Sequence, residues 1–213
     1  FCTVSEITAR ECESLLGSTV DVVTPNGFED DFVWNGREFD EKRAEARRAM
    51  IRTAEATLSC KFDGEPLIVG TSGRYEFRNK GIDIFLDALK QLAETDALDR
   101  EVLVYITVPS ATTGPRKDLQ AHLADENSPI DPKQNRFCTH YLEHPEWDQI
   151  LNSIAGSVLA NPSSKVKVVF VPTYLNGRDG IFDKSYYELL VGMDMTLFPS
   201  YYEPWGYTPL EST

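Results

Sequence analysis

The chain has 213 residues, of which 41% are hydrophobic and 26% charged, and its formal net charge at pH 7 is -13. This length is enough for one or two domains with a buried core. The negative charge repels polyphosphate backbones, so no nucleic acid is expected as a partner. The sequence shows neither an apolar run that could cross a membrane nor a signal peptide, so no membrane partner is expected.

The four cysteines and the two ends of the chain give further expectations. Cys2, Cys12, Cys60 and Cys138 are scattered without Cys-x-x-Cys spacing, and we interpret them as free thiols in a reducing, cytoplasmic compartment. The chain opens without a methionine and stops within the first turn of an expected helix. It therefore looks like an excised piece of a longer protein.

The first third of the chain contains expected elements of mixed type. Residues 1–4 are typical of the end of a strand, 7–16 of a helix, and 20–28 of a strand that runs into a Pro-Asn-Gly turn. Residues 38–58 combine many charges with good helix formers. This composition predicts an amphipathic, largely solvated helix that bridges two units.

From residue 65 onwards the pattern alternates between strands and helices. We expect strands over 67–70, 102–108, 166–171 and 195–198, helices over 82–92, 147–159 and 185–192, and a polar loop with some helix over 109–137. Strands that alternate with helices indicate an α/β fold. The sequence therefore predicts a doubly wound parallel sheet.

The most informative motif lies where the last expected strand ends. After Phe198 the chain reads Pro-Ser-Tyr-Tyr-Glu-Pro-Trp-Gly-Tyr-Thr-Pro-Leu-Glu, which sets Glu203 and Glu211 eight residues apart. Open parallel sheets bind ligands at the carboxyl ends of their strands, so both glutamates are candidate site residues. Thr208-Pro-Leu-Glu211 also fits a capping box with Thr208 as N-cap, which alone would account for Glu211.

A second motif, Gly73-Arg-Tyr-Glu-Phe-Arg-Asn-Lys-Gly81, follows the first strand of the alternating part. A helix that begins here would offer free N–H groups to a phosphate, and Arg74 and Lys80 would add full positive charges. The alternative is a solvated basic loop. We prefer that alternative for Arg78.

Three further side chains are candidates for binding a ligand. Tyr186, on a short helix before the last strand, could stack on a nucleobase, and packing in the core would explain it as well. His140 and His144 have i,i+4 spacing, with Cys138 nearby, that would suit zinc. Because Pro145 follows at once and no fourth ligand is evident, we expect no metal there.

Taken together, the Glu203-x7-Glu211 motif, the Gly73–Gly81 motif and Tyr186 resemble the animal and fungal type of glycogen synthase, which belongs to glycosyltransferase family 3. The resemblance covers about residues 1–28 and 65–213. It implies a GT-B fold of Rossmann-like domains. Residues 1–28 would be the tail of the N-terminal domain, 29–64 a helical connection, and 65–213 a truncated C-terminal domain that binds the nucleotide sugar.

The resemblance also implies a role for each candidate residue. It places Glu203 beside the donor glucose, and it makes Arg74 and Lys80 the groups that hold and stabilise the departing diphosphate. It implies that the remaining candidates bind the donor: Tyr186 the uracil, Glu211 the ribose, and the backbone of Gly206, Tyr207 and Thr208 the phosphates.

The implied activity is transfer of glucose, with retention, from UDP-glucose to the non-reducing end of an α-1,4-glucan in glycogen biosynthesis, without metal or other cofactor. UDP and ADP stay open as the donor's nucleotide, and so does the oligomeric state. Because most of the acceptor-side domain is missing, we expect the fragment alone to be inactive. The alternatives are a non-catalytic module that binds sugar nucleotides or glucan, and a hydrolase, which would leave Arg74 and Lys80 without a purpose.

Overall fold

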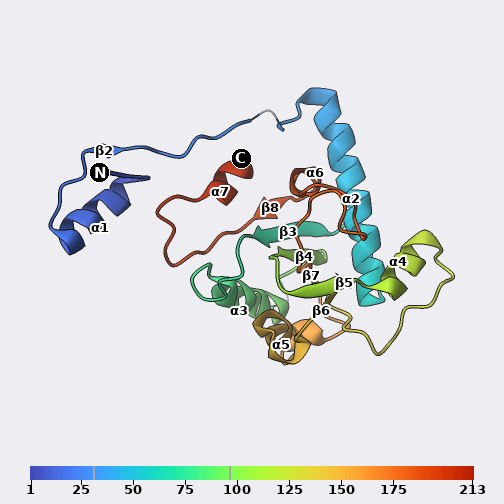
Figure 1. Ribbon diagram of the computed structural model, residues 1–213. Helices are drawn as coiled ribbons and strands as arrows, with labels where there is room; N and C mark the ends of the chain where they lie inside the picture. Colours follow the sequence, from blue (N-terminus) through green and yellow to red (C-terminus); the bar gives the residue numbers. More distant parts are fainter. Residues whose placement is uncertain (31, 96) are drawn as a thin grey trace.

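The computed structural model describes residues 1–30, 32–95 and 97–213. Its centre is a parallel sheet in the order β7-β4-β3-β8 (Figure 1). The four strands are β3 (Leu67–Ser72), β4 (Val102–Thr107), β7 (Val166–Phe170) and β8 (Met195–Thr196). The predicted α/β fold with a doubly wound parallel sheet is confirmed.

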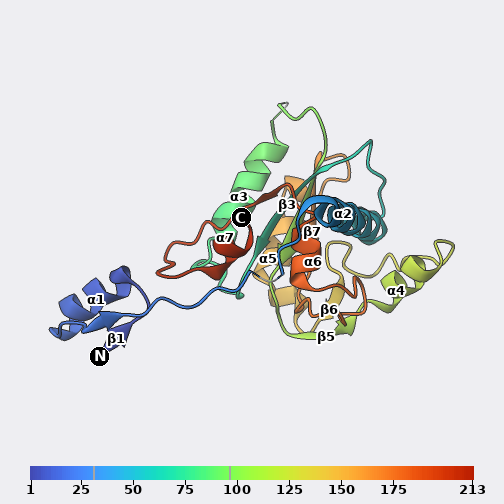
Figure 2. The ribbon, with the colours of Figure 1, turned by 90° about the horizontal axis from the view of Figure 1, so that it is seen from above.

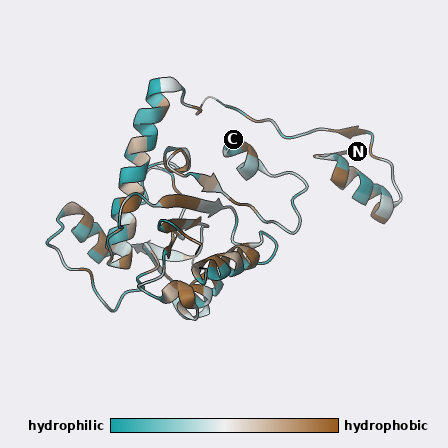
Figure 3. Cartoon of the chain, turned by 180° about the vertical axis from the view of Figure 1, so that it is seen from behind, coloured by the Kyte–Doolittle hydropathy of each residue, from teal (hydrophilic) through white to brown (hydrophobic). Residues whose placement is uncertain are grey.

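Helices cover both faces of this sheet, as the buried strand residues require. On one face, α3 (Ile82–Ala93) and α5 (Gln149–Ala155) pack against alternate residues such as Val104 and Val168. On the other, α2 (Gly36–Leu58) and α6 (Tyr186–Leu190) pack against the residues in between, such as Leu103 and Val169. Figure 3 shows hydrophobic strands between helices in which hydrophobic and hydrophilic residues alternate.

The path of the chain creates a switch point between β3 and β8. From β3 the chain steps outward through α3 to β4 and through α5 to β7, and it then returns by way of α6 to place β8 on the other side of β3. The loops after β3 and β8 therefore leave neighbouring strands toward opposite faces of the sheet. Such a point is where open α/β sheets leave room for a ligand.

The long helix α2 is amphipathic as predicted, but it is not largely solvated. Met50 and Ala54 are buried against the sheet, Ala46 is buried as well, and the Tyr105 hydroxyl donates a hydrogen bond of 2.7 Å to the Met50 carbonyl. The prediction of a largely solvated helix rested on the many charges of its outer side and overlooked the apolar stripe that faces the sheet. The division of the chain into domains stays a prediction.

The N-terminal residues form a small unit that stands apart from the central sheet (Figures 1 and 2). It consists of β1 (Cys2–Thr3) paired in parallel with β2 (Val22–Val23), and of α1 (Glu6–Leu16) between them. Both strands are shorter than predicted. The unit reaches the rest of the chain through hydrogen bonds from Tyr202 to Glu11 and from Tyr207 to the Gly27 carbonyl.

The segment expected as a polar loop contains more structure than predicted. β5 (Thr112–Pro115) pairs antiparallel with β6 (His140–Leu142), and α4 (Lys117–Ala124) lies between them in the chain. The sequence did not predict β5, because this strand contains Gly114 and Pro115 and both residue types are unfavourable in strands.

The single helix expected over 147–159 is divided into three pieces. The 3-10 helix η1 (Pro145–Trp147) comes first, then α5, then a second 3-10 helix, η2 (Val158–Ala160). Asp148 separates the first two, because its side chain accepts a hydrogen bond from the Leu151 N–H and so begins a new helix there. Gly156 ends α5.

Candidate active site

Glu203 and Lys80 lie together at the switch point, on the two loops that follow β8 and β3. Their side chains form an ion pair and are 25% and 15% exposed. The Ser200 hydroxyl lies 3.4 Å from the same glutamate oxygen. The residue predicted to face the sugar and a residue predicted to hold the diphosphate are therefore direct neighbours, although 123 positions separate them in the chain.

Backbone contacts hold the two loops against each other. The Tyr201 N–H donates a 3.0 Å hydrogen bond to the Asn79 carbonyl. Gly81, the N-cap of α3, has a φ of 65°, and a Cβ there would lie 1.9 Å from the Pro199 carbonyl oxygen. Only glycine fits this position, both for its φ and for the space. At Gly206 a Cβ would lie 2.8 Å from Cγ of Glu203, so this glycine makes room for the glutamate side chain.

A pocket of about 370 Å³ lies beside this pair, over the carboxyl ends of three strands. Ser72 and Thr107 at the ends of β3 and β4 line it, together with Thr173 beyond β7. Arg74 also lines it; its side chain is 75% exposed and lies 3.0 Å from Glu76. Lys80 and Glu203 do not line this pocket, and Arg74 forms its ion pair with Glu76 and not with Glu203.

Tyr186 lies in the wall of this pocket, and its hydroxyl is 2.7 Å from the Ser72 hydroxyl. Burial raises the pKa of Tyr186 to about 12, so the phenol is neutral at physiological pH. Its neighbour Tyr187 donates a 2.8 Å hydrogen bond to Glu211. Burial, followed by this contact with the carboxylate, raises the pKa of Tyr187 to about 12.

The predicted capping box at Thr208 is wrong. The helix α7 (Tyr207–Glu211) begins two residues earlier than predicted, with Gly206 as its N-cap and no side-chain capping bond. Proline is tolerated throughout the first turn of a helix, so Pro209 did not fix where the helix starts. Glu211 is therefore not held by a cap, and it bonds to Tyr187 instead. Thr208 lines the pocket from the first turn of α7, where backbone N–H groups have no partner within the helix.

Sequence reasoning missed Tyr174, whose side chain is 74% exposed and lines the same pocket. Tyr174 follows β7 by four residues, much as Arg74 follows β3 by two. Its place just beyond the carboxyl end of a strand was the signal that could have revealed it. Tyr174 offers a more open aromatic ring than the half-buried Tyr186.

The histidines that could have suggested zinc have separate environments. His140 is buried, with Nε2 3.0 Å from the Asp179 carbonyl and Nδ1 2.8 Å from the Thr139 hydroxyl. His144 lies near the surface and stacks on Trp147. Within residues 1–30, 32–95 and 97–213, no group of three or more His, Cys, Asp or Glu side chains is arranged to hold a metal ion.

The sheet order, the switch point and the pocket at the carboxyl ends define an α/β protein of the Rossmann-like class. The family model described as glycogen synthase matches residues 1–124 and 120–213. The chain belongs to the glycogen synthase family, and the resemblance drawn from its motifs is confirmed.

Three relatives show how much of such a protein the chain represents. It is 30% identical over 270 positions to the glycogen [starch] synthase of Neurospora crassa, 31% over 266 to the human liver protein and 28% over 270 to that of Caenorhabditis elegans. All three alignments cover the whole chain, but only 38%, 38% and 40% of the respective relative. The alignments are longer than the chain's 213 residues, so the relatives carry additional residues within the aligned region.

The family model matches the chain in two parts, which overlap over residues 120–124 near the end of α4. Among the helices of the described residues, none is both long enough and apolar enough to span a membrane.

Proposed function

We propose that this chain is the donor-binding part of a cytoplasmic glycogen synthase that transfers glucose, with retention, from UDP-glucose to the non-reducing end of an α-1,4-glucan. Membership of the family supports the reaction class. The observation that carries the proposal is the Lys80–Glu203 pair at the switch point of the sheet. It brings an acid and a base of the predicted roles to the place where such a fold binds its ligand.

The proposed chemistry divides two developing charges between the two side chains. When the bond between the sugar carbon and the diphosphate breaks, positive charge develops on the sugar ring and the electron pair leaves with the diphosphate. The Glu203 carboxylate stabilises the first charge. Lys80 and Arg74, with the backbone N–H groups at the start of α7, stabilise the second. In this proposal no metal or other cofactor takes part.

The pocket beside the pair has the lining that a nucleoside requires. Tyr174 and Tyr186 provide aromatic surface for the base, and stacking of a base on such a ring contributes about 1–3 kcal/mol. The remaining lone pairs of Glu211 would accept hydrogen bonds from the ribose hydroxyls, with Tyr187 holding the carboxylate in place. We propose uracil as the base, and the experiment below compares it with adenine.

The test follows transfer of labelled glucose from UDP-glucose and from ADP-glucose to glycogen by the full-length gene product and by its Glu203→Gln variant. We expect transfer from UDP-glucose, reduced about 100- to 1000-fold in the variant, because about 3–4 kcal/mol of electrostatic stabilisation is lost. Binding of UDP, measured by calorimetry in parallel, should survive the substitution.

Other results would change the proposal. Binding without transfer by the wild type would identify a non-catalytic module that recognises sugar nucleotides. Release of free glucose from glycogen, unaffected by UDP, would favour the hydrolase. The 213 residues alone are expected not to synthesise glycogen, and turnover by them would contradict that expectation.

A further inference from the structure

A second hollow, of about 430 Å³, lies beside the donor pocket and carries an exposed aromatic stack. Trp147 is 74% exposed, which is unusual for so large an apolar side chain. Its ring lies parallel to that of His144, with the centroids 5.2 Å apart and 24° between the planes. We call these two stacked rings the Trp147 platform. Aromatic rings exposed in this way offer a large, flat apolar surface on which a ligand can pack.

Hydrogen bonds hold the backbone that carries the platform. It is built on η1, where the Trp147 N–H donates to the His144 carbonyl at 3.2 Å. The Asn152 amide donates to the Glu146 carbonyl at 3.1 Å and so ties η1 to the next helix. The backbone beneath the two rings is therefore ordered before a ligand binds, which lowers the entropy cost of binding.

Tyr75 connects the platform to the candidate active site. It follows Arg74 in the chain, lines both the donor pocket and the second hollow, and donates a 2.9 Å hydrogen bond to Asp148. Asp148 in turn directly follows Trp147. The two hollows therefore share a wall, and a ligand on the platform would lie next to the donor.

The surroundings of the platform favour a neutral, hydroxyl-rich ligand. The carboxylates of Glu146 and Asp148 lie beside it and oppose a second phosphate. Ser110 and Gln149 line the hollow and offer hydroxyl and amide groups for hydrogen bonding. A glucose ring combines an apolar C–H face, which packs on an aromatic ring, with hydroxyl groups around its edge.

We propose that the Trp147 platform binds a glucose unit of an α-glucan chain and so holds the acceptor polymer beside the donor pocket. This inference rests on the proposed function, because it takes the polymer that the reaction extends as its ligand. It assigns to Trp147 a role in binding the acceptor and none in the chemistry.

The test uses Trp147 and Tyr174 as a matched pair, because both are aromatic and both are 74% exposed. Glycogen binding is measured as retardation in native gels that contain glycogen, and maltoheptaose and UDP binding by calorimetry. We expect Trp147→Ala to weaken maltoheptaose binding at least tenfold and leave UDP binding unchanged. We expect Tyr174→Ala to weaken UDP binding at least tenfold and to leave maltoheptaose binding unchanged. Trp147→Tyr, which keeps a flat ring, should restore most of the glucan binding.

The outcomes separate the two proposals. If glycogen retards Trp147→Ala as strongly as the wild type, the proposal that the Trp147 platform binds glucan is overturned. It is also overturned if the wild type binds UDP but glycogen does not retard it. Dimerisation in gel filtration that Trp147→Ala abolishes would identify a second copy as the occupant and also overturn it. If the protein binds glucan through Trp147 but does not bind UDP, the glucan-binding role of the Trp147 platform is supported and UDP-glucose is refuted as the donor.

Discussion

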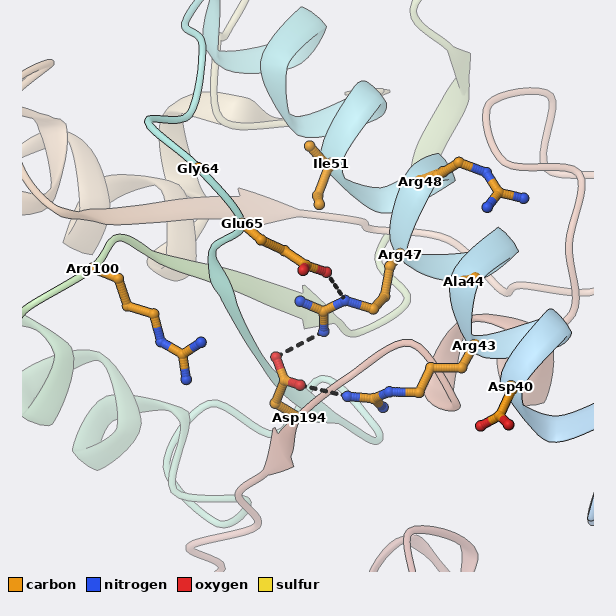
Figure 4. A pocket seen from close by; sticks show the side chains of 10 residues that line it. All are labelled: Asp40, Arg43, Ala44, Arg47, Arg48, Ile51, Gly64, Glu65, Arg100 and Asp194. Carbon is orange, nitrogen blue, oxygen red and sulfur yellow. Dashed lines mark hydrogen bonds and ion pairs between the residues drawn. The ribbon is translucent and has the colours of Figure 1, made fainter. Parts of the chain in front are cut away.

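Charged clusters lie at both ends of the strands of the central sheet, at the amino ends (the amino edge) and at the carboxyl ends (the carboxyl edge). The two clusters differ in whether their charges are paired within the protein or left accessible. At the amino edge, a hollow of about 720 Å³ is lined by four arginines (Figure 4). Arg47 bonds to both Glu65 and Asp194, and Arg43 bonds to Asp194 and to the Val191 and Met193 carbonyls. At the carboxyl edge, the smaller pocket has Arg74, which is largely exposed and meets only the partly exposed Glu76 among the described salt bridges.

This difference shows that the size of a hollow and its content of arginine do not by themselves indicate a ligand site. The Asp194 cluster joins α2 to the start of β8 and serves the fold, since its carboxylate also accepts a 2.8 Å hydrogen bond from the Ile68 N–H. The carboxyl edge keeps charge and aromatic surface accessible. That accessibility is what a site for a phosphorylated ligand requires.

The largest effect is expected from breaking the amino-edge cluster. Asp194→Ala removes three hydrogen bonds and leaves two arginines without their shared partner, so the free energy of unfolding should fall by about 2–4 kcal/mol. Affinity for UDP should not change. Urea denaturation with calorimetry checks both. The control is Glu65→Ala, whose exposed pair should contribute at most about 1 kcal/mol.

Asp194 also allows a prediction about pH. Burial is the largest single influence and raises the pKa of this carboxyl, but the hydrogen bonds from Ile68 and Arg47 together lower it below its ordinary value. Its contribution to stability is therefore complete above the unfolded pKa of about 3.9 and disappears as the pH falls through the lower folded value. The difference in stability between wild type and Asp194→Ala should be constant from pH 5 to 8, and a decline within that range would contradict the assignment.

At the carboxyl edge, opposite effects are expected from the two members of the ion pair. Lys80→Met should weaken UDP binding by about 1.5–3 kcal/mol, roughly 10- to 150-fold, because a charged donor to the diphosphate is lost. Glu203→Gln should tighten it, because the diphosphate no longer competes with the carboxylate for Lys80. Calorimetry with UDP measures both, and Lys90→Met, which removes a lysine on α3 that pairs with Asp87, is the control. Weaker UDP binding in Glu203→Gln would refute the idea that Glu203 competes with the diphosphate for Lys80.

A smaller effect should distinguish the two tyrosines of α6. Tyr186→Phe loses the hydrogen bond with Ser72 and should cost about 0.5–1.5 kcal/mol of stability, while UDP affinity persists because the ring remains. Tyr187→Phe releases Glu211 and should instead weaken binding of the ribose. Denaturation and UDP titration of both variants make the comparison, and identical profiles would show that the two residues do not differ in function.

The smallest expected effect comes from His140. Burial lowers its pKa, and the contact with the Asp179 carbonyl only partly opposes this. Its folded pKa therefore lies below the unfolded value of about 6.5, so stability is complete above pH 6.5 and falls as the pH drops below it, by at most about 1.4 kcal/mol per pH unit. Urea midpoints at pH 7.5 and 5.5 should differ less in His140→Gln than in the wild type.

The sequence predicted those parts of the fold that local pattern determines. Strand β4 is an almost continuous apolar run, β7 is apolar except for Lys167, and α3 has apolar residues at helical spacing, so each could be located from neighbouring residues alone. The β5–β6 pair could not, because its partners are more than 20 residues apart and β5 contains glycine and proline. The start of α7 was misplaced because a proline fits several positions in a first turn.

The candidate site shows the same limit more sharply. The motifs identified Glu203, Arg74 and Lys80 as residues of one site, but which of them touch follows from the strand order, which no local pattern contains. The structure pairs Lys80 with Glu203 and leaves Arg74 at the neighbouring pocket. Tyr174 was missed because a lone tyrosine beyond a strand carries no motif, and it gains meaning only beside Arg74 and Tyr186.

The short pairing between β3 and β8 has a consequence for how the protein is synthesised. Only two residue pairs, Val69 with Met195 and Gly70 with Thr196, join these strands, yet they bring Glu203 to Lys80. A nascent chain can build β3, α3, β4 and β7 while Lys80 still lacks its carboxylate. Because contacts between distant residues close slowly, the site should assemble last. Acquisition of UDP binding by a chain emerging from the ribosome would thus report that β8 has paired with β3.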